Sequence, residues 1–220
     1  MKIRARALRT FKGKHAPALL LLAGVVYAWF PTVAPARSGK PVRSLLEIRH
    51  ENVVIQNWDL SCGAAALATL LKYQYGQKIA EKDIASALIR RKEYVDDPSM
   101  INQRHGFSLL DLKRYTDQHG YKGIGYGKLT LADLKRKAPI LVPLRLNGYN
   151  HFVVFRGMAG NRVLLADPAW GNRTLLENDF ITAWIDFPVF GHVGFDVEPR
   201  EGPAHAGALK PKGRDFVMLR

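Results

Sequence analysis

Residues Gln56 to Leu71 read Q-N-W-D-L-S-C-G-A-A-A-L-A-T-L-L, and this stretch decides the fold. From Cys62 onward the run is apolar and rich in alanine, which favours a helix that is buried over most of its surface. Ser61 is a residue type preferred at the position before a helix, and Gly76 is a typical helix end. The pattern therefore predicts a buried helix with Cys62 in its first turn.

Three further helices are predicted before the chain turns to strands. Residues 81–91 are acidic at the start and basic at the end, as the helix dipole prefers. Ser108 with Asp111, and Thr130 with Asp133, have the spacing of capping boxes and each open a helix. Residues 92–107 are expected to form a loop. Residues 52–55 are expected to form a short extended entry to the domain.

Short apolar runs rich in β-branched and aromatic residues predict the strands that follow. They are expected at 139–144, 151–155, 162–167, 173–176, 192–197 and 216–219, with a short helix near 178–184 and a loop or loose tail over 198–215. Helices first and strands afterwards is an α+β order. The fold class predicted is therefore α+β, with the cysteine-bearing helix packed on an antiparallel sheet.

Two of these strands should form a hairpin, because Gly160-Asn161 between them is a turn signal. His151 opens the first strand about nine residues before the turn, and Asp167 closes the second about six residues after it. The two residues approach each other if strand twist or a β-bulge takes up the difference.

The N-terminus is typical of an export signal. Residues 1–36 carry six basic residues and no acid, then an apolar run over 16–30, then Ala34-Pro35-Ala36 with the small residues that a signal peptidase requires. We expect cleavage after Ala36; the alternative is an uncleaved anchor in the inner membrane, although the run is shorter than the roughly 20 residues that span a bilayer comfortably. Both place the domain in the periplasm. The expected organisation is a signal, a linker, one folded domain and a C-terminal extension (1–36, 37–50, 51–197 and 198–220).

The formal net charge is +14, and it remains +8 without residues 1–36. Such a balance suits a nucleic-acid or anionic partner, but the remaining lysines and arginines are scattered and form no nucleic-acid motif. A solvated basic surface accounts for the charge, so no nucleic-acid partner is expected.

Cys62 is the one cysteine of the chain, and exported proteins normally use cysteines in pairs. A single thiol in the first turn of a helix lies at the positive end of the dipole, which favours the nucleophilic thiolate. Of the seven histidines, His151 alone opens a strongly apolar strand, where it can point into a cleft. An ionised Asp167 beside it would fix the imidazole's tautomer, and Gln56 could donate to an oxyanion together with the backbone N–H of Cys62.

Each of these residues also has an ordinary structural interpretation. Cys62 could be a small buried apolar residue, and His151 a satisfied core or edge histidine. Asp167 precedes Pro168 and could simply form a turn. Gln56 could be an ordinary loop glutamine. A metal site is disfavoured, because one cysteine and one histidine do not have the usual spacing of metal ligands.

Three blocks in this order resemble the bacteriocin-processing C39 cysteine peptidases, which are papain-like enzymes that cleave leader peptides after a double glycine. The blocks are Gln56–Leu67, Asn150–Phe155 and Val163–Gly171, and 180–184 also looks like the family's closing helix. The resemblance covers residues 52–190. It implies that Gln56 supplies the oxyanion hole, Cys62 the nucleophile, His151 the base and Asp167 the third member, with no metal and no cofactor.

The chain departs from the family pattern in two ways. Ser61 stands where members commonly carry an acidic residue, and an export signal stands in place of a fused exporter. This resembles the stand-alone exported members, including one encoded with the functional-amyloid (Fap) secretion systems of pseudomonads. The expected partner is thus an exported polypeptide, an amyloid subunit or secretion component, with Trp58 and Trp170 predicted to line its groove or merely to pack in its walls. The alternative function is a non-cleaving domain that binds such a substrate as a chaperone or secretion accessory.

Overall fold

The computed structural model describes residues 42–201 and 207–219, and the predicted signal over 1–36 lies outside them. Helices dominate the first half and strands the second, so the predicted α+β class is confirmed. The helices before the sheet are α1 to α6 (Leu45–Arg49, Cys62–Tyr73, Glu81–Ile89, Lys92–Asp96, Ser99–Gln103, Leu109–Gln118). No helix within the described ranges is long and apolar enough to cross a bilayer.

Six strands form one antiparallel sheet in the order β1-β8-β2-β3-β4-β5. Their bounds are β1 Tyr121–Tyr126, β2 Ile140–Leu146, β3 Tyr149–Ala159, β4 Arg162–Asp167, β5 Gly171–Leu176 and β8 Gly194–Pro199. Strands β6 (Asp186–Phe187) and β7 (Gly191–His192) form a separate small hairpin. The remaining helices are α7 (Leu131–Lys137), α8 (Glu177–Ala183) and α9 (Asp215–Met218).

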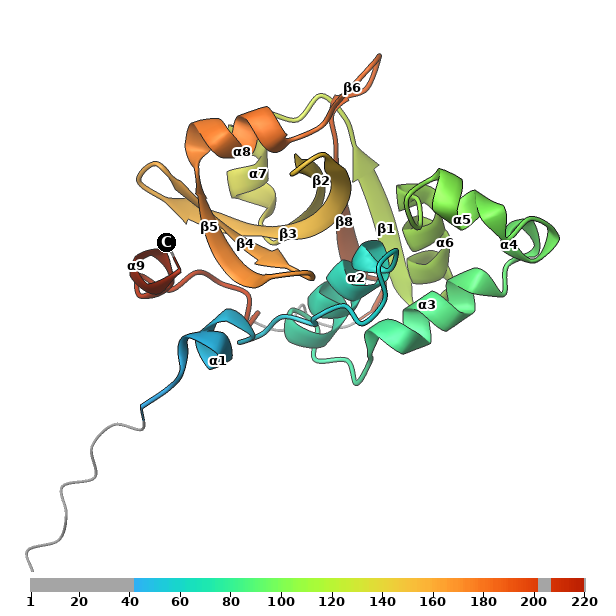
Figure 1. Ribbon diagram of the computed structural model, residues 1–220, viewed down its shortest axis with the longest axis horizontal. Helices are drawn as coiled ribbons and strands as arrows, with labels where there is room; N and C mark the ends of the chain where they lie inside the picture. Colours follow the sequence, from blue (N-terminus) through green and yellow to red (C-terminus); the bar gives the residue numbers. More distant parts are fainter. Residues whose placement is uncertain (1–41, 202–206, 220) are drawn as a thin grey trace, which may run out of the picture. The chain divides into compact units, whose positions relative to one another are not determined.

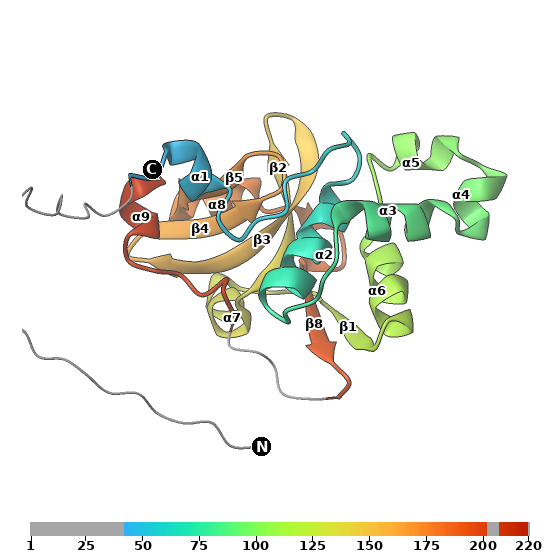
Figure 2. The same ribbon diagram turned by 90° about the horizontal axis from the view of Figure 1, so that it is seen from below.

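The sheet is covered on both faces, which gives two apolar cores. In Figures 1 and 2, α2 lies between the sheet and α3, while α6 lies beside α2 and against β1, and side chains of these helices form the first core with Leu141 and Val154. Helices α7 and α8 cover the other face and form the second core with Val153 and Phe155. Successive residues of β3 thus point to opposite cores, as the two-residue period of a strand requires.

Several sequence predictions are confirmed. Cys62 begins α2, and both predicted capping boxes are present, with Ser108 accepting from the N–H of Asp111 and Thr130 from that of Asp133. The hairpin of β3 and β4 forms across the predicted turn.

Other predictions are wrong. The segment 92–107 contains α4 and α5, and 216–219 lies at α9 and its end instead of in a strand. Strand β1 was not anticipated, because Gly123 and Gly125 look like loop residues. Gly123 is needed because α6 packs so closely that a Cβ there would lie 2.5 Å from the hydroxyl of Thr116.

Two segments expected to lie outside the domain also pack against the strands. Helix α1 falls in the predicted linker and contacts β5, where a Cβ at Gly171 would lie 2.6 Å from the carbonyl oxygen of Arg49. Residues 207–219, expected as part of a loose tail, bury Leu209 completely and end against Thr174 of β5.

Candidate active site

The sulfur of Cys62 is held where α2 begins, beside the early part of β3. Cys62 is 5% exposed, and the N–H groups of a helix's first turn have no acceptor within the helix. Gly63 allows Phe152 of β3 to approach, since a Cβ there would lie 3.3 Å from the phenyl ring. The helix start is therefore fixed next to His151, the neighbour of Phe152 in the chain.

A buried carboxylate that the sequence analysis did not single out holds the loop before Cys62. Glu81, 1% exposed, accepts hydrogen bonds from the backbone N–H of Asn57 at 2.9 Å, from the Asn57 side-chain amide at 2.8 Å and from the Ser61 hydroxyl. Ser61 stands at the N-cap position of α2, as predicted, but its side chain makes no capping hydrogen bond, because its hydroxyl lies against Glu81 and the carbonyl of Trp58 instead. A buried carboxyl group needs hydrogen-bond partners, and those of Glu81 include Ser61, the residue before Cys62.

His151 and Asp167 are brought together from β3 and β4. The imidazole Nε2 lies 2.6 Å from Asp167 Oδ1, which also accepts from the N–H of Ala169 at 2.9 Å. The other carboxylate oxygen of Asp167 lies 3.5 Å from the guanidinium of Arg173. Because Nε2 is engaged by the carboxylate, Nδ1 is the ring nitrogen left for the thiol of Cys62.

The environment stabilises the charged forms of both groups. Burial lowers the pKa of His151, but its hydrogen bond to Asp167 and its contact with Cys62 outweigh burial and raise the pKa to about 9. Burial raises the pKa of Asp167, but the hydrogen bond and charge of His151, the N–H of Ala169 and the charge of Arg173 together hold it below its usual value. At neutral pH the pair is therefore imidazolium and carboxylate.

Two clefts meet at Cys62 and His151. One, of about 840 Å³, runs along the polar side, where the loops of residues 56–60, 145–150 and 167–173 line it. The other, of about 470 Å³, is apolar and lies between the start of α6, β3 and the small β6–β7 hairpin. Its apolar lining includes Phe107, Leu110, Phe152, Phe187 and Phe190. A chain lying across both clefts would pass the thiol.

Gln56 lines the polar cleft, but its amide is turned onto its own loop. The side-chain nitrogen donates to the carbonyl of Trp58 at 3.0 Å and to that of Asp59 at 3.3 Å, and the side-chain oxygen is buried without a partner among the described residues. The backbone N–H of Gln56 donates to the carbonyl of Pro168 at 2.9 Å, which ties the loop before Cys62 to the loop after Asp167. Donation to an oxyanion by Gln56 would require its amide to rotate.

The two tryptophans differ in position. Trp170 lines the polar cleft and lies 5.3 Å from the guanidinium of Arg49 and 5.9 Å from that of Arg173. Trp58 is half exposed and lines neither cleft. The sequence does not identify Arg173 as a neighbour of Asp167, because a basic residue six positions further along the chain is not a recognisable motif.

The chain matches the model of the Peptidase C39 family over residues 50–190. It is 37% identical over 186 residues to a Pseudomonas fluorescens protein named "Probable functional amyloid protease FapD", covering 81% of this chain and 79% of that one. A Pseudomonas aeruginosa protein of the same name is 37% identical over 160 residues, covering 71% of this chain and 68% of the other.

Solved structures share the fold. A double glycine motif protease from an AMS/PCAT transporter superposes with a TM-score of 0.52 at 22% identity, covering 67% of this chain and 90% of the other. The peptidase domain of Streptococcus ComA gives 0.53 at 19% identity, covering 68% and 99%. The family match and the curated relatives together identify this chain as a cysteine peptidase of the Peptidase C39 family.

Proposed function

We propose that this peptidase acts in the periplasm on an exported polypeptide, with Cys62 as nucleophile, His151 as general acid and base, and Asp167 as the residue that orients the histidine. The observation that carries the catalytic assignment is the buried 2.6 Å contact of His151 with Asp167 beside the thiol of Cys62. The signal-like sequence of residues 1–36, which predicts export, supports the location. The names of the Pseudomonas relatives support a functional-amyloid subunit or a component of its secretion apparatus as substrate.

In the first half of the reaction, the Cys62 thiolate attacks the carbonyl carbon of the scissile peptide bond, and the π electrons move onto the oxygen. The backbone N–H of Cys62 and the reoriented amide of Gln56 stabilise that oxyanion. The oxyanion collapses, the C–N bond breaks, and the leaving nitrogen takes the proton from His151 Nδ1. A thioester on Cys62 and a neutral imidazole remain.

In the second half, the neutral imidazole removes a proton from water, and the resulting hydroxide attacks the thioester carbonyl. The tetrahedral intermediate collapses, expelling the Cys62 thiolate and releasing the new carboxyl terminus. The imidazolium of His151 is restored, and Asp167 stabilises it in both halves without exchanging a proton. No group outside the chain, apart from water, enters this cycle.

The two clefts define what the substrate presents. The apolar cleft fits a segment with bulky apolar side chains on one side of the scissile bond. The polar cleft, with Trp170 and Arg145 in its lining, accepts an extended chain on the other side. Trp58, which lines neither cleft, is a weaker candidate for substrate contact than Trp170.

The test is cleavage of co-expressed secreted proteins. The functional-amyloid subunit and its secretion components are expressed with the wild-type chain, with Cys62→Ala, or with His119→Gln as a control, since His119 ends α6 and lines neither cleft. We expect one secreted protein to be shortened by the wild type and His119→Gln, and to keep its full length with Cys62→Ala. Equal lengths in all three, with the chain still bound to the protein, would support the non-cleaving binding domain.

A further inference from the structure

Strand β3 contains one residue more than its partner strand requires. Phe155 pairs with Leu165 and Gly157 pairs with Leu164, so Arg156 has no partner across the ladder. This is a β-bulge, which bends a strand and shifts every side chain beyond it by one position relative to the neighbouring strand.

The bulge decides whether His151 and Asp167 share a face of the sheet. On the His151 side of the bulge, Val154 pairs with Ala166, and carrying this register one residue further sets Asp167 opposite Val153. Since side chains alternate along a strand, Asp167 then lies on the same face as Val153 and His151. If Arg156 paired regularly instead of bulging, the register of the turn end would continue and set Asp167 opposite Val154, on the face away from His151. The 2.6 Å contact of His151 with Asp167 therefore depends on the bulge.

The bulge is held by a buried charge. Arg156 is 4% exposed, and its Nε donates to the carbonyl of Leu209 at 2.9 Å while one terminal nitrogen donates to Asn172. The other terminal nitrogen lies 3.7 Å from the carboxylate of Asp215. Removing the partners of a buried guanidinium strongly destabilises the folded protein, so these contacts fix the direction of the Arg156 side chain.

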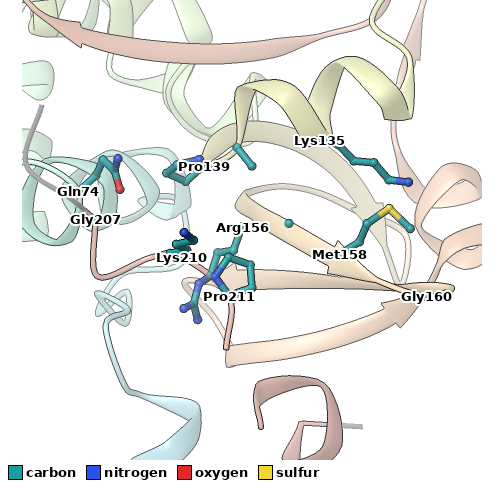
Figure 3. A pocket seen from close by; sticks show the side chains of 11 residues that line it. Gln74, Lys135, Pro139, Arg156, Met158, Gly160, Gly207, Lys210 and Pro211 are labelled. Atoms are coloured by element: carbon teal, nitrogen blue, oxygen red, sulfur yellow. The ribbon is translucent and has the colours of Figure 1, made fainter. Parts of the chain in front are cut away.

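Gly157, the residue after Arg156, lies against the same C-terminal segment. Gly157 has a φ of +145°, which favours glycine, and a Cβ there would lie 2.7 Å from the ring of Pro211. Figure 3 looks into the pocket that Arg156, Gly157 and Pro211 line together with Lys210. The chain from Gly207 onward thus packs directly on the irregular part of β3.

This C-terminal segment, residues 207–219, also touches the other elements that carry the site. The N–H of Ala208 donates at 2.9 Å to the carbonyl of Tyr73, the last residue of α2. The carbonyl of Leu219 accepts from both the N–H and the hydroxyl of Thr174 in β5, the strand paired with β4. The segment lies beyond residues 50–190, the part matched by the family model.

We propose that residues 207–219 act as a strap that locks the Arg156 bulge and thereby sets the register in which His151 meets Asp167. Arg156 is accordingly a positioning residue of this peptidase: it lines neither cleft and acts through the register of β3. The inference rests on the proposed roles of His151 and Asp167.

The test follows the titration of His151 by NMR in protein carrying isotope-labelled histidine, so no substrate is needed. Arg156→Met keeps a long side chain and removes the charge and its three contacts. We expect the pKa of His151 to fall from about 9 by at least about one, because the carboxylate no longer lies against the ring. Arg136→Met is the control, since Arg136 lies in α7 and its exposed side chain bonds Asp133 and, among the described residues, none of the strap. It should leave the titration unchanged.

A milder variant covers the case in which Arg156→Met does not fold. Arg156→Lys retains the charge, but a single amine cannot serve Leu209, Asn172 and Asp215 in the same geometry. An intermediate fall in the pKa of His151 is expected, with the folded state checked by circular dichroism. A folded Arg156→Met or Arg156→Lys protein whose His151 titrates as in the wild type would overturn the inference.

The failure of this inference is distinguishable from failure of the proposed function. If Asp167→Asn lowers the pKa of His151 but both Arg156 variants leave it at about 9, the catalytic pair stands and the strap proposal is wrong. If Asp167→Asn also leaves the titration unchanged, the pair itself is wrong, and the proposed mechanism is overturned with it.

Discussion

Replacing Asp167 with asparagine tests how the site keeps a proton on His151. The substitution is nearly isosteric and removes the negative charge that lies 2.6 Å from Nε2. Burial alone lowers the pKa of His151. The pKa is nevertheless about 9, because the interactions with Asp167 and Cys62 outweigh the effect of burial. The rise from 6.5 to about 9 corresponds to about 3 kcal/mol in favour of the imidazolium. With Cys62 still in place, we expect Asp167→Asn to bring the pKa down by about 2.

The consequence is large at mildly alkaline pH. At pH 8 the imidazolium fraction should fall from about nine-tenths in the wild type to about one-tenth in Asp167→Asn. NMR titration of His151 measures this directly, with His151→Gln used to assign the signal. The alkaline limb of the pH–rate profile should move with the titration, because the imidazolium supplies the proton to the leaving nitrogen. A variant that keeps the wild-type pKa would refute the view that Asp167 holds the proton on His151.

Three other outcomes are expected. The raised pKa of His151 contributes stability that is fully present below pH 6.5 and is lost as the pH rises through about 9, so the melting temperature of the wild type should drop over that range and that of His151→Gln should not. Glu81→Gln leaves the donors of Asn57 and Ser61 poorly matched and should lower the free energy of unfolding by about 1–3 kcal/mol in chemical denaturation, whereas an unchanged midpoint would mean that Glu81 does not hold the loop. Gln56→Ala should lower kcat by roughly 10²-fold with little change in KM, and an unaltered kcat would leave the oxyanion to the backbone N–H of Cys62.

The features predictable from the sequence are those with local signals. The start of α2 at Cys62 follows from the small apolar run, and the capping boxes at Ser108 and Thr130 follow from the spacing of their partners. The turn at Gly160-Asn161 sets the hairpin that brings His151 and Asp167 near one another. Each of these depends on residues within a few positions of one another, or on one hairpin.

The features that were missed depend on partners far away in the chain. Strand β1 forms because β8, about 70 residues later, pairs with it, and Glu81 becomes part of the site only because α3 returns to the loop before Cys62. The C-terminal segment looks like a loose tail until its contact with Arg156 is seen. No local pattern reports such contacts, since each residue involved is ordinary in its own sequence context.

The most direct test of the central claim is labelling with a thiol-reactive peptide probe, read by intact mass and peptide mapping. The account predicts one adduct, on Cys62, formed rapidly by the wild type, slowly by His151→Ala and not at all by Cys62→Ala. A wild-type protein that stays unlabelled, or that reacts as slowly as folded His151→Ala, would contradict the claim that His151 activates the thiol of Cys62.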